Sequence, residues 1–153
     1  MTYQRADLGS IYLPVGNMLQ IDRAISVDEH RIVCEMDVHP SHWVFPLHFP
    51  GDPIYPGCLQ VEAAGQVVAI WAWHNGLRGR PRLAKVSAEF ELPIRPQPGP
   101  VVFTGTIRLR RHICLGSVEL TVGGRLAATV ELALVIVPEG VNGGDGSGGG
   151  PPP

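Results

Sequence analysis

The residues best suited to chemistry lie between His48 and Gln66, in the segment HFPGDPIYPGCLQVEAAGQ. An imidazole titrates near neutral pH, so a histidine such as His48 can both remove and return a proton. Glu62 carries the single carboxyl group of the apolar run that follows, and Gln66 comes four residues later. In a helix these two side chains would share one face, where the amide could orient the carboxyl group. A histidine and a carboxyl group in one short segment can support general acid–base catalysis.

The segment divides into a stiff loop and a helix, which together must position these side chains. Three prolines between residues 48 and 56 lack amide protons, so this stretch cannot be a helix or a central strand. From Cys58 the run CLQVEAAGQVVAIWAW is apolar nearly all round, which predicts a helix buried on every side. The first amides of a helix have no partner within it, so those at Gly57 and Cys58 could stabilise a developing negative charge.

The remainder of the chain is dominated by alternating apolar and polar residues, the pattern of half-buried strands. Such runs are RIVCEMDV (31–38), LAKVSAEFEL (83–92), VVFTGTIRLR (101–110), HICLGSVEL (112–120) and RLAATVELALVIV (125–137). Gly123-Gly124 separates the last two runs and predicts a hairpin. One long apolar helix followed by meandering strands predicts an α+β fold, with an antiparallel sheet wrapped round the helix.

Composition narrows the class of protein. The chain has 153 residues, 44% of them hydrophobic, and a net charge of −2, which suits one domain with a proper core. The charge favours neither nucleic acid nor a membrane as a partner, and no targeting or spanning segment is evident, so we expect a cytoplasmic protein. Three widely spaced cysteines form neither a zinc pattern nor a disulfide framework. His39, His42 and His48 are close in sequence, but intervening prolines break any helix that would align them, so we expect no metal. The sequence contains no P-loop and no dinucleotide-binding fingerprint, so we expect no organic cofactor.

The two ends differ from the middle of the chain. Residues 1–10 are polar and predict a flexible N-terminal arm. Residues 138–153 contain the low-complexity sequence EGVNGGDGSGGGPPP, which cannot bury apolar surface and predicts a disordered Gly/Pro-rich tail. The folded domain is therefore expected over residues 11–137.

The segment from His48 to Gln66 closely resembles the active-site segment of the 3-hydroxyacyl-acyl-carrier-protein dehydratases (FabZ/FabA-like). In that family the pattern is His-Phe-x-Gly-x-Pro, then Pro-Gly, then Glu or Asp, then Gln. The matching positions are His48, Phe49, Gly51, Pro53, Pro56, Gly57, Glu62 and Gln66. The resemblance covers residues 11–137 and implies the hot-dog fold, in which a curved antiparallel sheet wraps a long central helix.

The resemblance also implies a hydro-lyase that removes water from 3-hydroxyacyl thioesters by a syn-type elimination. His48 would take the α-proton, and the amides of Gly57 and Cys58 would hold the thioester oxygen. Glu62, which an apolar helix would keep protonated, would donate to the departing hydroxyl group. We also assign Tyr55 and Gln66 to substrate binding.

The implied partners are an acyl carrier protein with a phosphopantetheine arm and a second copy of the chain. In the family, the histidine and the carboxyl group that form one site come from different subunits of a homodimer, and the peptide bond after the histidine is cis. The basic residues Arg78, Arg80 and Arg82 could dock the acidic carrier, or could simply be a solvated loop.

Several alternatives stay open. Glu62 and the Phe-Pro-Gly after His48 match the dehydratases that stop at the trans-2-enoyl product, whereas Asp52, Cys58 and the last hairpin match those that also isomerise it. We favour dehydration alone, in fatty acid or polyketide synthesis. Leu47 stands where the family usually has a glycine or another small residue, which puts the acyl length in doubt. A hot-dog acyl thioesterase and a non-catalytic acyl-binding or heterodimer subunit are the other possibilities.

Overall fold

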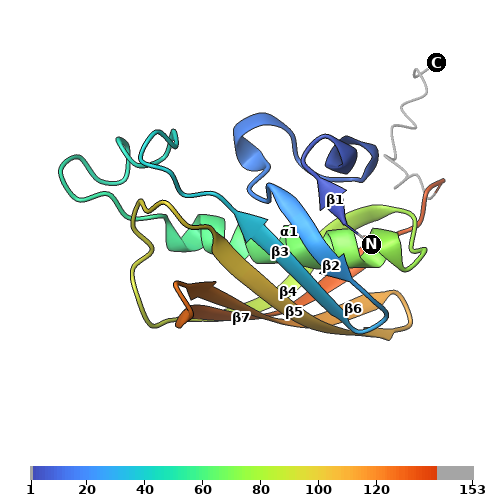
Figure 1. The fold of residues 1–153 in the computed structure, drawn as a ribbon. Helices are drawn as coiled ribbons and strands as arrows, with labels where there is room; N and C mark the ends of the chain where they lie inside the picture. Colours follow the sequence, from blue (N-terminus) through green and yellow to red (C-terminus); the bar gives the residue numbers. More distant parts are fainter. Residues whose placement is uncertain (1, 141–153) are drawn as a thin grey trace, which may run out of the picture.

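The fold is built from one long helix and a sheet that curves round it (Figure 1). The computed structural model describes residues 2–140. The helix α1 spans Gly57–His74, within one residue of the predicted apolar run at each end. It ends where Asn75 and Gly76 follow, and Gly76 has a φ of 86°, the left-handed conformation in which helices commonly stop.

Within the described residues, seven strands form a single antiparallel sheet in the order β1-β2-β3-β5-β6-β7-β4. They are β1 (Tyr3–Gln4), β2 (Arg23–Val27), β3 (Arg31–Met36), β4 (Arg80–Phe90), β5 (Val101–Arg110), β6 (Ile113–Val122) and β7 (Arg125–Val137). The five predicted strands are all present, and the α+β layout of a helix wrapped by an antiparallel sheet is confirmed. Strand β4 follows α1 in sequence yet pairs with β7, so it forms one edge of the sheet.

The core lies between α1 and the concave face of the sheet. Burial alternates along β5, because Val101, Phe103 and Ile107 point at the helix while their neighbours do not. The helix approaches most closely where the strands carry glycine. A Cβ atom at Gly116 would lie 2.9 Å from Val68 Cγ2 on α1, so no larger residue fits there without a shift.

The N-terminal residues correct one prediction. We expected a flexible arm over residues 1–10, but Tyr3 and Gln4 pair with β2, and Leu8 is buried in the core. The first ten residues are held by one buried leucine and a two-residue strand, which are too short to produce a periodic pattern in the sequence. At the other end, most of the expected tail lies outside the described residues, which stop at 140.

The helix also departs from its prediction, since it is not buried on every side. Cys58 is exposed, and Val61, Glu62 and Gly65 are only half-buried. These four positions follow helical spacing and form one stripe along the first half of α1. Glu62 therefore lies on a face of α1 that the chain does not cover completely.

Candidate active site

His48 lies in a loop that projects beyond the N-terminal end of α1 (Figure 1). Paired backbone hydrogen bonds between Phe49 and Asp52, of 2.8 and 2.9 Å, close the tip of the loop. Gly51 has a φ of 77° at this tip, which a residue with a side chain rarely adopts. The His48-Phe49 peptide bond is cis, as predicted, and the two rings stack with centroids 3.9 Å apart.

One hydrogen bond fixes the chemical state of the neutral His48 ring. His48 Nδ1 lies 2.9 Å from the backbone oxygen of Ile54, which can only accept, so Nδ1 carries the proton. Nε2 of the neutral ring is then the unprotonated nitrogen, available as a base. The same two residues share a second hydrogen bond, in which the amide of Ile54 donates to the backbone oxygen of His48 at 2.9 Å. This bond holds the backbone of His48 in place.

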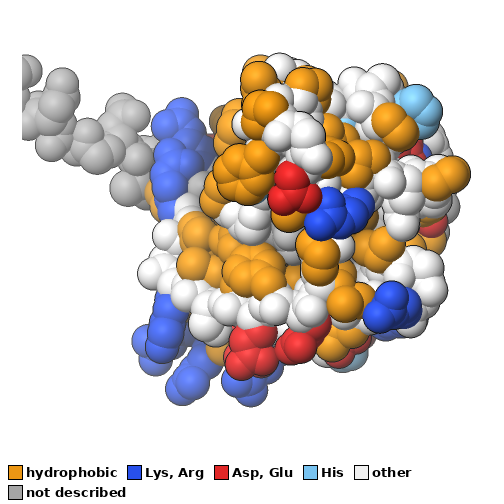
Figure 2. Space-filling model, turned by 90° about the vertical axis from the view of Figure 1, so that its left-hand side faces the viewer, with side chains coloured by type: hydrophobic (Ala, Val, Ile, Leu, Met, Phe, Trp, Pro, Cys, Tyr) orange, Lys and Arg blue, Asp and Glu red, His pale blue; other side chains and the backbone are white. Residues whose placement is uncertain are grey.

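His48 borders a cavity of about 370 Å³ that reaches the start of α1. Its lining includes Ile54 of the loop, Gly57 and Gln60 of α1, and Phe90 at the end of β4. The first backbone hydrogen bonds of α1 run from Leu59 and Gln60 to Pro56 O, so the amides of Gly57 and Cys58 precede them. Hydrophobic side chains gather across this end of the molecule (Figure 2). A histidine base and helix N-terminal donors thus share a largely apolar cavity.

Glu62 is held by Gln66, one turn further along α1. Gln66 Nε2 donates to Glu62 Oε1 at 3.1 Å and to the backbone oxygen of Met18 at 2.7 Å. Gln66 Oε1 accepts from the amides of Gln20 and Ile21, at 2.8 and 3.4 Å. These four contacts fix which way the amide points, so its N–H group always faces Glu62. The orienting role expected of Gln66 agrees with this geometry, and its amide has no hydrogen-bonding capacity left for a substrate.

Tyr55 also lies behind the site. Its ring is fully buried, and its hydroxyl group donates to Gln20 Oε1. Burial raises the pKa of this phenol far above its ordinary value, so it stays neutral. The backbone amide of Tyr55 donates to Ile94 O at 2.7 Å. The Tyr55 side chain therefore packs behind the loop as a buried support, although the residue is among those that line the His48 cavity.

His48 and Glu62 face different sides of the helix in one copy of the chain. Of the described residues, those that line the His48 cavity include Gly57 and Gln60 of α1 but not Glu62. Each residue turns an α-helix by about 100°, so Glu62 points roughly 200° away from Gln60. A single chain therefore does not bring His48 and Glu62 together in this cavity, and the carboxyl group that lines it is that of Glu91.

The predicted docking arginines lie at the opposite end of the molecule from His48. Arg78 follows the C-terminal end of α1, where it donates to Trp73 O at 2.6 Å and its guanidinium lies 3.8 Å above the Trp73 ring. Arg80 and Arg82 begin β4, whereas Phe90 of the cavity ends it. The 18 residues of α1 separate the two ends by about 27 Å.

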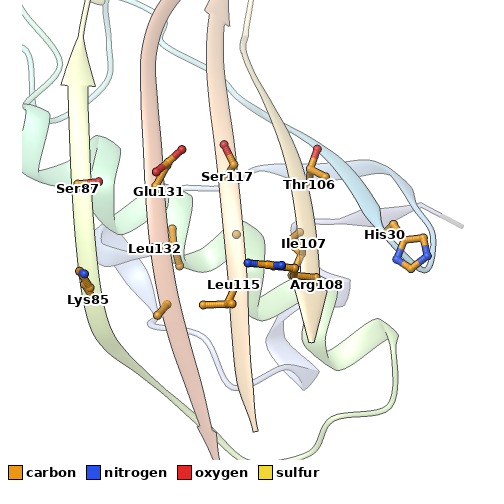
Figure 3. Close-up of a pocket in the computed structure, with 12 residues that line it drawn as sticks. His30, Lys85, Ser87, Thr106, Ile107, Arg108, Leu115, Ser117, Glu131 and Leu132 are labelled. Carbon is orange, nitrogen blue, oxygen red and sulfur yellow. The ribbon is translucent and has the colours of Figure 1, made fainter. Parts of the chain in front are cut away.

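A larger hollow lies elsewhere, on the face of the sheet away from α1. It measures about 720 Å³, and Lys85, Thr106, Arg108 and Ser117 are among its lining residues (Figure 3). None of the predicted catalytic or substrate-binding residues lines it. This hollow does contain titratable groups, His30, Lys85 and Glu131, but none of them belongs to the segment from His48 to Gln66. We therefore place the candidate chemistry at the smaller cavity, which His48 and Gly57 of that segment line.

The described residues offer nothing that resembles a metal site. Residues 2–140 contain no cluster of three His, Cys, Asp or Glu side chains that could hold a metal ion. The two histidines near His48 in sequence form hydrogen bonds with residues close to them in the chain. His39 bonds to the hydroxyl group of Ser41, and His42 accepts from the amide of Val44.

No helix in the described part of the chain combines the length and hydrophobicity needed to cross a membrane.

Sequence reasoning missed three residues that shape the site. Gln20 and Phe90 are far from the loop in sequence, and only the fold brings them to it. Gln60 could have been singled out from the sequence, because it is a second amide in the apolar helix run. Its spacing from His48, however, matches no known pattern.

Comparison with known proteins agrees with this geometry. A model of the FabA-like domain matches residues 13–131. Similar solved structures include the dehydratase heterocomplex ApeI:P from Xenorhabdus doucetiae, with a TM-score of 0.69, 19% identity, and coverage of 85% of this chain and 91% of that chain. Thioesterase HI1161 from Haemophilus influenzae matches with a TM-score of 0.66 and 17% identity, over 90% of this chain and 93% of that one. AziG from S. sahachiroi matches with a TM-score of 0.57 and 22% identity, over 77% and 91%. At these identities the structures establish the shared fold, which confirms the hot-dog prediction.

Proposed function

Because the chain belongs to the FabA-like domain family, we propose that it removes water from 3-hydroxyacyl thioesters, giving trans-2-enoyl thioesters in fatty acid or polyketide synthesis. The observation that carries the proposal is the His48 Nδ1 contact with Ile54 O, which leaves Nε2 as a base beside the start of α1. The substrate is an acyl chain on the phosphopantetheine arm of a carrier protein.

The first half of the reaction is proton removal. His48 Nε2 takes a proton from C2 of the substrate, and the electrons of that C–H bond move toward the thioester carbonyl. Negative charge develops on the carbonyl oxygen, where the amides of Gly57 and Cys58 stabilise it. Phe90 and Leu92 supply apolar surface to the same cavity, and an apolar surrounding strengthens these interactions.

The second half is loss of the hydroxyl group. The electrons return to form the C2–C3 double bond while the bond between C3 and oxygen breaks, and Glu62 donates the proton that lets the oxygen leave as water. Gln66 occupies Glu62 Oε1 with an N–H donor, so the proton to be donated is on Oε2. His48 ends with an extra proton and Glu62 without one, and exchange with solvent restores both.

This chemistry needs a second copy of the chain, because His48 and Glu62 of one copy face different sides of α1. The edge strand β4 offers the surface for it. Leu83, Val86 and Phe90 pair with inward-facing residues of β7 yet remain exposed, and in the part of the chain that the structure describes no strand lies beside the outer edge of β4. Pairing two β4 edges would cover these side chains and extend the sheet across a homodimer.

The same pairing would place the carrier-docking arginines. Two antiparallel β4 strands run in opposite directions, so the start of one lies beside the end of the other. The partner's Arg80 and Arg82 would then lie near Phe90 and the mouth of the His48 cavity. Within one copy these groups are at opposite ends of the molecule, so we assign docking to arginines of the neighbouring subunit.

The test is to incubate the purified protein with 3-hydroxyacyl thioesters of several chain lengths and to separate the products. We expect enoyl thioester, in which the bond between the acyl group and the sulfur atom is still intact. Release of free acid and thiol instead would favour the acyl thioesterase, whose fold some of the similar structures share. Binding without any product would favour a non-catalytic subunit. Either of these results would contradict the proposal.

A further inference from the structure

Gln60 is a buried amide that makes one hydrogen bond and leaves its carbonyl oxygen without a partner. It is 3% exposed and lies in the first turn of α1. Its Nε2 donates to the backbone oxygen of Tyr55 at 3.2 Å. Among the described residues, Gln60 Oε1 and Trp71 Nε1 are the buried side-chain atoms without a hydrogen-bond partner, and Gln60 is the one of the two that lines the His48 cavity.

The orientation of this amide is set by its surroundings. Turning it over would bring Oε1 against the Tyr55 oxygen, two acceptors facing each other, and would leave the N–H group unpaired instead. The carbonyl end is therefore the free end. A buried carbonyl oxygen without a partner has lost its hydrogen bonds to water and has formed no other in their place, which costs free energy. We therefore expect it to accept a hydrogen bond from a ligand when the site is filled.

The position of Gln60 says which part of a ligand would meet it. Gly57 and Gln60 are three residues apart on α1, which places them on nearly the same face and about 4.5 Å apart along the axis. Ile54, Phe90 and Leu92 supply apolar walls to the same cavity. If the Gly57 amide holds a thioester oxygen, Gln60 lies next to groups a few bonds from that carbonyl, and a small shift of its side chain would expose the buried Oε1 to them.

We propose that Gln60 binds substrate directly, with Oε1 accepting a hydrogen bond from an N–H or O–H group close to the thioester. This inference rests on the proposed function for the identity of the ligand. Two groups of a 3-hydroxyacyl pantetheine thioester offer that chemistry. One is the amide N–H nearest the sulfur, and the other is the hydroxyl group on C3.

The experiment measures binding, so that it does not depend on turnover. Calorimetric titrations would use saturated acyl thioesters of N-acetylcysteamine, which carry the N–H but no hydroxyl group. The matched probe is the same acyl thioester of 2-mercaptoethyl acetate, in which oxygen replaces that N–H. A third probe is the 3-hydroxyacyl thioester of 2-mercaptoethyl acetate, bound to the His48→Ala protein so that it is not consumed.

The protein variant is Gln60→Met, which keeps the volume of the side chain and removes both polar atoms. Wild type and variant with each probe form a double-mutant cycle between the protein group and the ligand group. If the pantetheine amide is the partner, the variant binds the N–H probe about tenfold more weakly and the saturated ester probe equally well. If the C3 hydroxyl is the partner, the tenfold loss appears only with the hydroxylated probe.

Other outcomes overturn the inference. Equal weakening of all three probes would mean that Gln60 only supports the cavity wall, and unchanged binding would mean that Oε1 meets no ligand group. Thermal unfolding of the variant separates damage to the fold from loss of contact, and Gln60→Leu repeats the comparison if Gln60→Met unfolds. A wild-type protein that binds the probes but forms no enoyl product contradicts the proposed reaction and leaves this inference standing. One that binds none of them overturns both.

Discussion

Gln66 Nε2 lies 3.1 Å from Glu62 Oε1, and its other hydrogen bonds to residues 18–21 prevent the amide from turning. The proposed acid is thus aligned by a residue that has no free atom for the substrate. Gln66→Glu is isosteric and keeps the oxygen that accepts from Gln20 and Ile21, but it replaces the donor to Glu62 with a second carboxylate oxygen.

We expect Gln66→Glu to lower kcat by about 10- to 100-fold with little change in KM, because misplacing a catalytic group costs rate rather than binding. Two facing carboxylates repel when both are ionised, which disfavours ionisation of the pair, so the loss of activity with rising pH should begin at a higher pH in the variant than in wild type. Steady-state kinetics over a range of pH checks both points. A uniform loss with an unchanged pH profile would mean that Gln66 merely supports the fold.

The choice between the two branches of the family gives a second prediction. Glu62→Asp shortens the acid by one methylene group, which changes its reach by about a bond length without changing its chemistry. We expect the variant to dehydrate more slowly and to gain no isomerase activity, because moving the double bond requires proton transfers at C2 and C4 that cavity shape controls. Wild type supplied with a trans-2-decenoyl thioester should form no cis-3 product. Its formation at rates near those of dehydration would place the protein in the isomerising branch.

Assembly through β4 gives a third prediction. Val86 is exposed on the helix side of this edge strand, opposite Leu132 of β7. Val86→Lys should convert a dimer into a monomer and abolish dehydration, because a lysine cannot be buried there unpaired and the two halves of each site then separate. Ser87→Lys is the matched control, with the same charge on the other face of the strand. Sedimentation velocity at micromolar concentration distinguishes them, and a wild type that sediments as a monomer would refute the interface.

Burial of His42 gives a prediction about pH. Desolvation lowers the pKa of His42 below the ordinary 6.5, in a cluster where its ring contacts Trp43, Phe45 and Tyr55. The folded protein therefore binds this proton less readily than the unfolded chain does. The contribution of neutral His42 to the free energy of unfolding is fully present above pH 6.5, and it is lost as pH falls from 6.5 through the lowered pKa.

His42→Phe keeps a ring in the cluster and removes the titrating group. Its unfolding midpoint should vary less than that of wild type between pH 6.5 and 5. The carboxyl groups with lowered pKa values, Asp28 and Asp37, act only below their ordinary 3.8, outside this window. Midpoints from thermal unfolding at a series of pH values test the difference. Parallel curves for the two proteins would show that His42 does not contribute to acid sensitivity.

Much of the fold was predictable because its elements have strong local patterns. The apolar run of α1 and the alternation in β5 and β7 gave their bounds to within a residue. Strand β2 was missed because its register shifts between Ala24 and Ser26, which breaks the alternation that a strand normally shows. A two-residue strand such as β1 has no pattern to detect.

The site was predictable only in part, for a related reason. His48, Gly57 and Glu62 stand in one segment that carries a family pattern, so they could be singled out. The hydrogen bonds that fix Gln66 come from backbone atoms of a segment distant in sequence. Every residue type has these backbone atoms, so the sequence does not indicate such bonds. That the base and the acid face different sides of α1 follows from helix geometry, but which side borders the cavity depends on how the loop folds back.

The most direct test of the central claim is a measurement on mixed dimers. His48→Ala and Glu62→Gln should each lose about 10²- to 10⁴-fold in rate, since each lacks one of the two catalytic groups. A dimer with one subunit of each kind, isolated through two different affinity tags, would contain one intact site and one that lacks both groups. We predict that it forms enoyl thioester at about half the wild-type rate.

The matched control is a mixed dimer of wild type and the double variant His48→Ala/Glu62→Gln. If each site takes its base from one subunit and its acid from the other, every site in this dimer lacks one group, and the protein should be inactive. If both groups come from the same subunit, the outcomes are reversed: the control is half as active as wild type, and the dimer of single variants is inactive. That reversed result would contradict the account.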